Sequence, residues 1–162
     1  MAIKILACDP ATHFGWAYSP DGASIGAGGV FDLSVRRDES GGMRLVRLVG
    51  KLNEIMGSLG IDLLVFEAAR NAGPVHQGAL VVQAEIQGVI KHWCEERRIQ
   101  YRGYSPTEIK RHATGKGNSG KPLMLAAAEK MWPEVEIEDD NHADAMWLLD
   151  LAIRDYGQGI MG

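Results

Sequence analysis

The chain has 162 residues, of which 46% are hydrophobic and 23% are charged, and its formal net charge is −4 at pH 7. This length and composition predict one soluble globular domain over residues 1–162. They exclude a membrane protein, because no apolar run approaches the ~20 residues of a spanning helix. The two cysteines, Cys8 and Cys94, are too few for a disulfide framework and are expected to be buried thiols of a cytoplasmic protein.

Three short strands are predicted first. Residues 3–8, 13–18 and 24–31 have the pattern of strands, and the turn SPDGA between the last two favours an antiparallel meander. A helix is predicted over 41–60 from its apolar spacing. The remaining predicted elements are strands over 61–67 and 99–105 and helices over 76–98, 106–113, 121–132 and 141–156. This order predicts an α/β domain with a mixed sheet, whose later strands run parallel to the first.

Positive charge is concentrated in one part of the chain. Residues 91–121 contain eight Lys or Arg and three Glu, so this segment has a charge of +5 and the remainder a charge of −9. Such an asymmetry indicates either a basic binding face or a solvated surface, and charge alone leaves both interpretations open.

Three acids lie at the ends of elements that are otherwise apolar. Asp9 ends the first strand, Glu67 ends the run LLVFE, and Asp144 lies in the first turn of the last helix. Parallel neighbouring strands would bring Asp9 and Glu67 to one edge of the sheet, where the last helix can add Asp144. Three carboxylates that share a partly buried site repel one another, which favours a hard divalent cation, Mg²⁺ or Mn²⁺. Two such ions suit phosphodiester cleavage.

Each acid also has a purely structural explanation. Asp9 precedes Pro10 and could be a turn residue, Glu67 could pair with Arg70, and Asp144 could complement the helix dipole. Their joint position, at the ends of two buried strands and the start of the last helix, favours a shared metal site.

The loop TGKGNSGKP contains a pattern that resembles a phosphate-binding loop. Its Gly-x-x-x-x-Gly-Lys pattern runs from Gly115 to Lys121. The next residue is Pro122, which has no hydroxyl for Mg²⁺, and the loop follows a predicted helix instead of a buried strand. We therefore interpret it as a basic loop that contacts a DNA backbone.

Four blocks of the sequence, in order, resemble one known family. The blocks are ACDPATHFGWA, VFE, YSPTEIKRHATGKGNSGK and NHADAMWLL. They are similar to the RuvC family of Holliday-junction resolvases, within the RNase H-like superfamily, and the compact chain resembles phage or prophage members. The resemblance covers nearly the whole chain. It implies an RNase H-like mixed five-stranded sheet, with three antiparallel strands and then parallel ones, flanked by helices.

The resemblance also implies a set of metal ligands. Asp9, Glu67 and Asp144 match three acids of the family's site, which holds two Mg²⁺ or Mn²⁺ ions. The fourth acid of the family falls on Asn141, which is a departure. Asn141 can offer a carbonyl oxygen, and the neighbouring Asp140 is an alternative ligand. Asn141, Asp140 or Asp139 could also be the helix cap, and His142 should point away from Asp144.

Basic residues extend this comparison to the substrate. Lys110 and Lys121 match two lysines that the family uses near the scissile phosphate and along the DNA, so Lys121 is also a candidate catalytic residue. Arg111 and Lys116 are candidate DNA contacts from charge alone. The loop after Glu67 carries Arg70 but no aromatic wedge, and Arg70 is a further candidate DNA contact. The four tryptophans lie in apolar patterns and are expected in the core or an interface.

The function implied is a metal-dependent endonuclease that resolves Holliday junctions or other branched DNA. A homodimer, with the helix at 76–98 as its interface, would make paired symmetric nicks that leave 5′ phosphates. One alternative is a junction-binding module that cuts weakly or not at all, a hypothesis motivated by Asn141. Another is a nuclease of the same fold that acts on flaps, forks or RNA–DNA hybrids. The sequence identifies no recombination or branch-migration partner.

Overall fold

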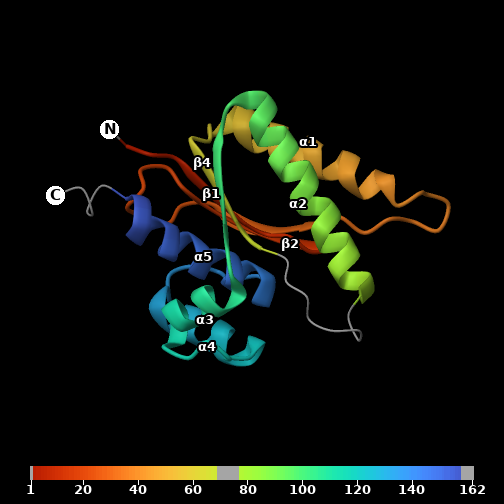
Figure 1. Ribbon diagram of the computed structural model, residues 1–162. Coiled ribbons are helices and arrows are strands. Elements are labelled where there is room, and N and C mark those ends of the chain that lie inside the picture. Colours follow the sequence, from red (N-terminus) through yellow and green to blue (C-terminus); the bar gives the residue numbers. More distant parts are fainter. Residues whose placement is uncertain (1, 69–76, 158–162) are drawn as a thin grey trace.

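The computed structural model describes residues 2–68 and 77–157 (Figure 1). Its core is a five-stranded sheet with the strand order β3-β2-β1-β4-β5. Strands β1, β2 and β3 pair antiparallel, whereas β4 is parallel to β1 and β5 is parallel to β4. The strands are β1 (Ile5–Asp9), β2 (His13–Ser19), β3 (Gly28–Asp32), β4 (Leu63–Glu67) and β5 (Gln100–Tyr104). This is the mixed sheet that the sequence predicts.

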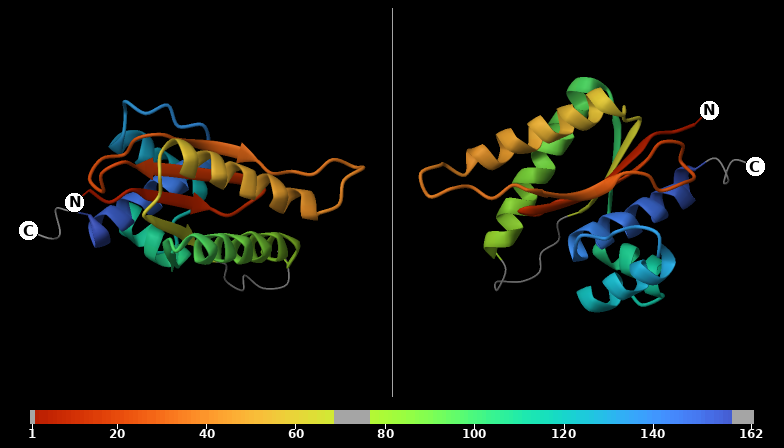
Figure 2. Two further views of the ribbon diagram at one scale, coloured as in Figure 1. Left: turned by 90° about the horizontal axis from the view of Figure 1, so that it is seen from above. Right: turned by 180° about the vertical axis from the view of Figure 1, so that it is seen from behind.

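Helices cover both faces of the sheet (Figure 2). Helices α1 and α2 lie on one face, and α5 lies on the other with α3 and α4 packed outside it (Figure 1). The helices are α1 (Gly42–Ser58), α2 (Gln77–Arg97), α3 (Pro106–Thr114), α4 (Lys121–Met131) and α5 (Asp140–Tyr156). Each predicted helix is therefore present, with its ends within a few residues of the expected ones.

The alternation of side chains along the strands divides the core into two layers. Leu6 and Cys8 of β1, together with Leu64 of β4, pack with α1 and α2. Ile5 and Ala7 belong to the cluster formed with α3, α4 and α5. By the same alternation, the last residues of β1 and β4, Asp9 and Glu67, belong to the α5 face.

The third strand begins later than predicted, at Gly28 instead of residue 24. The cause is Asp21, whose Oδ1 accepts hydrogen bonds from the backbone N–H groups of Ala23 (2.9 Å) and Ser24 (2.8 Å). Gly22 has φ +73°, a conformation that favours glycine. The predicted turn is present, but it extends past residue 24 and shortens the strand.

Burial confirms the predictions for both cysteines and for three of the four tryptophans. Both Cys8 and Cys94 are fully buried free thiols. Three tryptophans (Trp93, Trp132 and Trp147) lie in the core, and the half-buried Trp16 stacks on Phe31. Within residues 2–68 and 77–157, no helix combines the length and apolarity needed to cross a membrane.

Candidate active site

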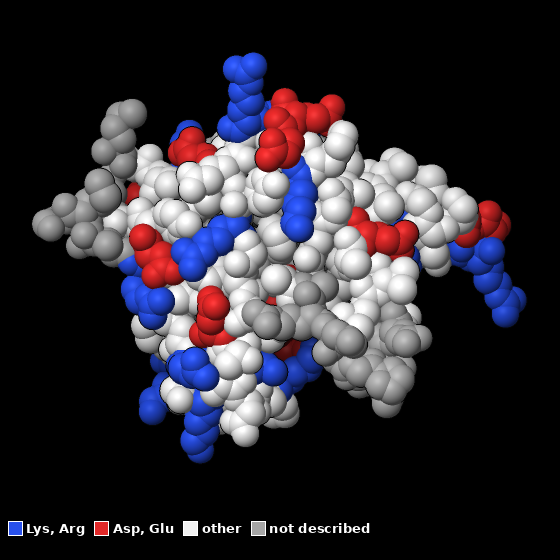
Figure 3. All heavy atoms as spheres, viewed as in Figure 1, with Lys and Arg blue, Asp and Glu red and all other residues white. Residues whose placement is uncertain are grey.

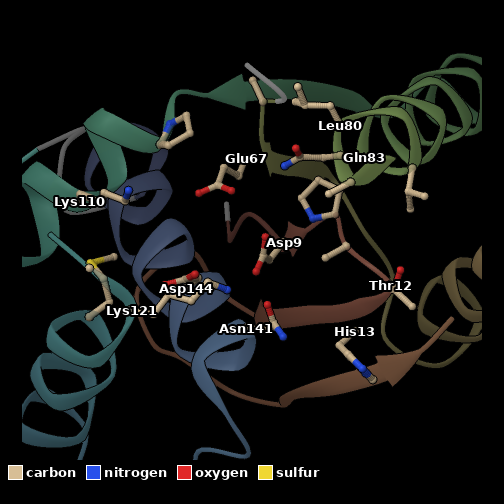
Figure 4. A pocket seen from close by; sticks show the side chains of 18 of the residues that line it. Asp9, Thr12, His13, Glu67, Leu80, Gln83, Lys110, Lys121, Asn141 and Asp144 are labelled. Atoms are coloured by element: carbon tan, nitrogen blue, oxygen red, sulfur yellow. The ribbon is translucent and has the colours of Figure 1, made fainter. Parts of the chain in front are cut away.

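The carboxyl ends of β1 and β4 place two acids side by side. Cys8 of β1 is aligned with Phe66 of β4 in the parallel register, so Asp9 and Glu67 follow at the same edge of the sheet. Asp9 is only 6% exposed. Both side chains point into the same cleft (Figure 4). The parallel pairing of these strands thus creates the juxtaposition that the sequence predicts.

Helix α5 brings the third acid to this edge. The Oδ1 atom of Asp139 accepts a hydrogen bond from the backbone N–H of His142 (2.9 Å), so Asp139 is the N-cap and the helix begins at Asp140. Asp144 follows one turn later and faces Asp9 and Glu67 across the cleft (Figure 4). Its Oδ1 atom is buried and has no hydrogen-bond partner in the described part of the chain. An unpaired buried acceptor is costly, so this oxygen is a candidate ligand for a cation.

A glycine in β2 allows this close approach of α5. A Cβ atom at Gly15 would overlap the carbonyl oxygen of Asn141 and would lie 2.5 Å from its carbonyl carbon. At Gly28 of β3, a Cβ atom would lie 2.8 Å from the Nε2 atom of His142. The start of α5 therefore lies directly on the backbone of the β2–β3 hairpin, which fixes the depth at which Asn141 and Asp144 enter the cleft.

The three acids perturb one another electrostatically. Burial raises the pKa of Asp9 well above its ordinary value, and the charges of Glu67 and Asp144 raise it further. Burial also raises the pKa of Glu67, against the lowering effect of Lys110 and Lys121. Burial and then the charge of Glu67 raise the pKa of Asp144 to about 7. Carboxyl groups with raised pKa values that face one another in a cleft are typical of functional sites.

These residues fit a divalent metal site in their chemistry. All the donors are oxygens, as Mg²⁺ and Mn²⁺ prefer, and the orphaned Oδ1 of Asp144 is available as a ligand. In residues 2–68 and 77–157, no three Asp, Glu, His or Cys side chains already form a closed metal-binding group. Binding of a divalent ion would therefore have to draw the carboxylates closer together. The positive charge of the ion would offset the repulsion between them.

The structure also separates the two candidates for the fourth ligand. Asn141 lines the cleft beside Asp144 and points toward Asp9 (Figure 4). Asp140 instead accepts a hydrogen bond from Nζ of Lys121 at 2.8 Å. This ion pair lowers the pKa of Asp140. Asn141 is thus placed to join the acids, whereas Asp140 orients a lysine.

The cleft has a volume of about 860 Å³ and a basic side. Lys110 of α3 and Lys121 at the start of α4 both line it. Burial lowers the pKa of Lys121, but the Asp140 hydrogen bond and charge, together with Asp144 and Asp9, outweigh burial and raise it. In the view of Figure 3, further Lys and Arg side chains gather over the lower part of the molecule, where α3 and α4 lie. The later part of the basic segment, from Lys110 to Lys121, therefore adjoins the acidic centre. Lys91 and Arg97 do not, because they lie in the second half of α2, whereas its first turns line the cleft.

Three known structures resemble this fold over most of the chain. RuvC from Thermus thermophilus has a TM-score of 0.70 at 16% sequence identity, over 94% of this chain and 95% of that one. T. thermophilus RuvC in complex with a Holliday junction substrate has a TM-score of 0.73 at 16% identity, over 95% and 93%. The yeast mitochondrial Holliday junction resolvase Ydc2 has a TM-score of 0.59 at 14% identity, over 94% and 80%. The chain has the RuvC fold. No protein-family model matches it, and no curated protein matches it in sequence.

The RuvC fold confirms the resemblance seen in the four sequence blocks and the predicted five-stranded mixed sheet. On this fold, six predicted residues line one cleft: Asp9, Glu67, Lys110, Lys121, Asn141 and Asp144. Two other predicted DNA contacts, Arg111 and Lys116, do not line it. Arg70 lies outside the described residues.

His142 points away from the cleft, as expected. Its Nδ1 atom accepts a hydrogen bond from the backbone N–H of Glu138 at 3.0 Å, and the side chain is 3% exposed. Burial lowers the pKa of His142, against the charges of Glu138 and Asp139. The residue therefore anchors the start of α5 instead of serving as a ligand.

The cleft also contains several residues that no sequence pattern singled out. Thr12 and His13 lie just beyond Asp9, and Gln83 of α2 points toward Glu67 (Figure 4). Ser119 lies in the loop before α4. Thr12 and His13 follow Asp9 closely in the sequence, and this proximity could have indicated that they line the same cleft. Gln83 had no such signal, because its position depends on how α2 crosses the sheet.

The raised pKa of Asp144 predicts a pH-dependent stability of the metal-free protein. The folded state retains a proton that the unfolded state loses, so the contribution of Asp144 to stability falls as the pH rises from about 4 to about 7. His142, whose folded pKa is lowered, contributes in the opposite direction, so wild type must be compared with Asp144→Asn. Between about pH 4 and pH 8, the stability of Asp144→Asn relative to wild type should rise by on the order of 3 kcal/mol. Urea unfolding in EDTA measures this difference, and parallel pH profiles for the two proteins would contradict it.

Proposed function

We propose that this protein is a metal-dependent endonuclease that resolves Holliday junctions and other branched DNA. The observation that carries the proposal is the group of desolvated carboxylates, with the orphaned Oδ1 of Asp144, beside two lysines in one cleft. The RuvC fold supports it, since one structural neighbour is a RuvC in complex with a Holliday junction substrate.

Asp9, Glu67, Asn141 and Asp144 would hold up to two Mg²⁺ or Mn²⁺ ions. When bound, these ions supply Lewis acidity for the attacking water and for the departing 3′ oxygen of a phosphodiester. The rigid strand ends orient the carboxylates of Asp9 and Glu67, and α5 orients Asn141 and Asp144. Departure of the 3′ oxygen leaves a 5′ phosphate that a ligase can reseal.

Lys110 and Lys121 would bind the phosphates of the cleaved strand. Lys121 is already held over the cleft by Asp140, so its ammonium group is preoriented toward the charge that develops on the scissile phosphate. Arg111 and Lys116, which lie outside the cleft, would add salt-dependent affinity without sequence information.

Lys121→Ala should therefore lower the cleavage rate by about 10²-fold at saturating DNA. Lys130→Ala, at an exposed position of the same helix, is the matched control and should leave this rate unchanged. Single-turnover kinetics at two salt concentrations provides the measurement. If both variants changed only the salt dependence of binding, Lys121 would have no role beyond general charge.

A homodimer would place two such sites on the opposed strands of a four-way junction. The two-fold symmetry of the junction matches the two-fold symmetry of such a dimer. Apolar surface on α1 and α2 supports this arrangement. Val46 and Val81 are 61% and 58% exposed, and a shallow apolar groove lies between the two helices. The two sites would then make paired symmetric nicks.

One observation favours a second candidate function. The cleft holds Asn141 where the family has an acid, which weakens the attraction for a second cation. A protein with this site could bind junctions and cut them slowly or not at all.

Cleavage of an end-labelled synthetic four-way junction distinguishes the two functions. A linear duplex of the same sequence is the control, and each DNA is incubated with Mg²⁺, Mn²⁺ or EDTA. The proposal predicts paired, ligatable nicks in the junction alone, which EDTA abolishes. Tight junction binding without nicks in either metal would contradict the nuclease and support the binding module. Preferential cutting of flaps, forks or RNA–DNA hybrids would support the nuclease chemistry but show that the substrate is not a four-way junction.

A further inference from the structure

The cleft has one wall that the proposed reaction does not use. The acids form its floor, and the two lysines stand on one side (Figure 4). The remaining wall comes from the first turns of α2 and carries no charge. Its members are Gly78, Ala79, Leu80, Val82 and Gln83. An uncharged wall beside a phosphate-binding centre suits the part of a nucleotide that is not phosphate.

The position of this wall relative to the acids is fixed. Gln87 is 8% exposed, and its Nε2 atom donates a hydrogen bond to the backbone carbonyl of Glu67 at 3.2 Å. Ile86 and Ile90 of the same helix are fully buried. Gln83 lies one turn before Gln87 on the same side of α2, so it stands over the end of β4.

Leu80 and Gln83 together offer the two kinds of contact that a nucleobase requires. Both are half-buried cleft residues, and Gln83 directs its amide toward the space beside Glu67 (Figure 4). Leu80 provides apolar surface for the face of a base. The amide of Gln83 provides both a donor and an acceptor for a base edge. The cleft, at about 860 Å³, is at the upper end of the roughly 300–1,000 Å³ of small-ligand sites, which leaves room for a nucleoside beside the phosphate.

We propose that Leu80 and Gln83 bind a nucleobase next to the scissile phosphate, and that Gln83 sets the base preference of cleavage. The inference rests on the proposed nuclease function and adds its substrate specificity. Enzymes that act on DNA can draw a base out of the stack, which exposes its edge to such a contact. A hydrogen-bonding side chain then favours the base whose edge complements it and rejects bases that leave the amide unpaired.

The test uses a set of fixed four-way junctions that carry each of the four bases at each position flanking the cut. Cleavage rates are measured for wild type, for Gln83→Leu, which keeps the size but removes the hydrogen bonds, and for Glu85→Gln. The last is the control, because Glu85 is an exposed residue of the same helix that does not line the cleft. For wild type and Glu85→Gln, we expect the best and worst bases at one flanking position to differ by about tenfold or more. For Gln83→Leu, that ratio should fall to nearly one.

A general loss of rate that is equal for all four bases in Gln83→Leu would overturn the inference, since a merely structural role predicts that result. A wild-type enzyme that cuts junctions without any base preference would also overturn it, while leaving the proposed function intact. A wild-type protein that cuts no junction would overturn both.

Discussion

Asp9→Asn should reduce junction cleavage by about 10³-fold or more, and it should stabilise the metal-free protein at about pH 8. Both effects have the same cause. Asp9 is almost fully buried at the end of β1, and burial, Glu67 and Asp144 all disfavour its ionised form. The amide keeps the shape of the side chain and removes a buried charge. The stabilisation should grow as the pH rises above the ordinary pKa range of an aspartate, because only the ionised side chain carries the cost of burial and repulsion.

Cleavage assays and urea unfolding in EDTA measure the two effects on the same preparation. Junction binding in EDTA should persist, because the lysines that contact phosphate remain. The control is Asp38→Asn, at an exposed acid in the loop before α1, which should change neither quantity. If the Asp9→Asn protein still cut at the wild-type rate, Asp9 would have no role in catalysis. One that loses stability would contradict the electrostatic explanation.

Gly15→Ala should destabilise the protein by about 3 kcal/mol or more. The new Cβ would overlap the backbone of Asn141 and lie 3.1 Å from the backbone nitrogen of His142. Backbone atoms cannot rotate away as a side chain can, so α5 would have to move off the sheet. Because α5 carries Asn141 and Asp144, any molecules that remain folded should also lose cleavage activity.

Gly50→Ala and Gly57→Ala are matched controls in α1, where a Cβ would meet nothing within 4 Å. Each should stabilise the protein by about 0.5–1 kcal/mol, because alanine favours the helix. Chemical denaturation of all three variants gives the comparison. If Gly15→Ala were as stable as wild type, α5 could not lie against the backbone of β2 at Gly15.

The sequence predicted the elements and the strand ends well because both depend on local patterns. Asp9 and Glu67 could be assigned to one edge from the parallel order of their strands alone. The late start of β3 was missed because it depends on the hydrogen bonds that Asp21 makes to the backbone of its own turn.

Other features depend on distances between elements, which no sequence pattern specifies. Gly15 has no side chain whose pattern could reveal its contact with Asn141. The choice between Asn141 and Asp140 required the actual start of α5 and the position of Lys121. Gln83 reaches the cleft only because α2 crosses the sheet above β4.

The N-cap of α5 also limits how the length of this chain can vary. Asp139 sets the start of the helix, and each helical residue adds about 100° of rotation. An insertion between Asp139 and Asp144 would therefore turn the Asp144 carboxylate out of the cleft, even if every other contact were kept. An insertion in the irregular stretch 133–138 would leave the cap and the helix register intact. Homologous chains are thus expected to differ in length before Asp139 and to keep a constant spacing from there to Asp144.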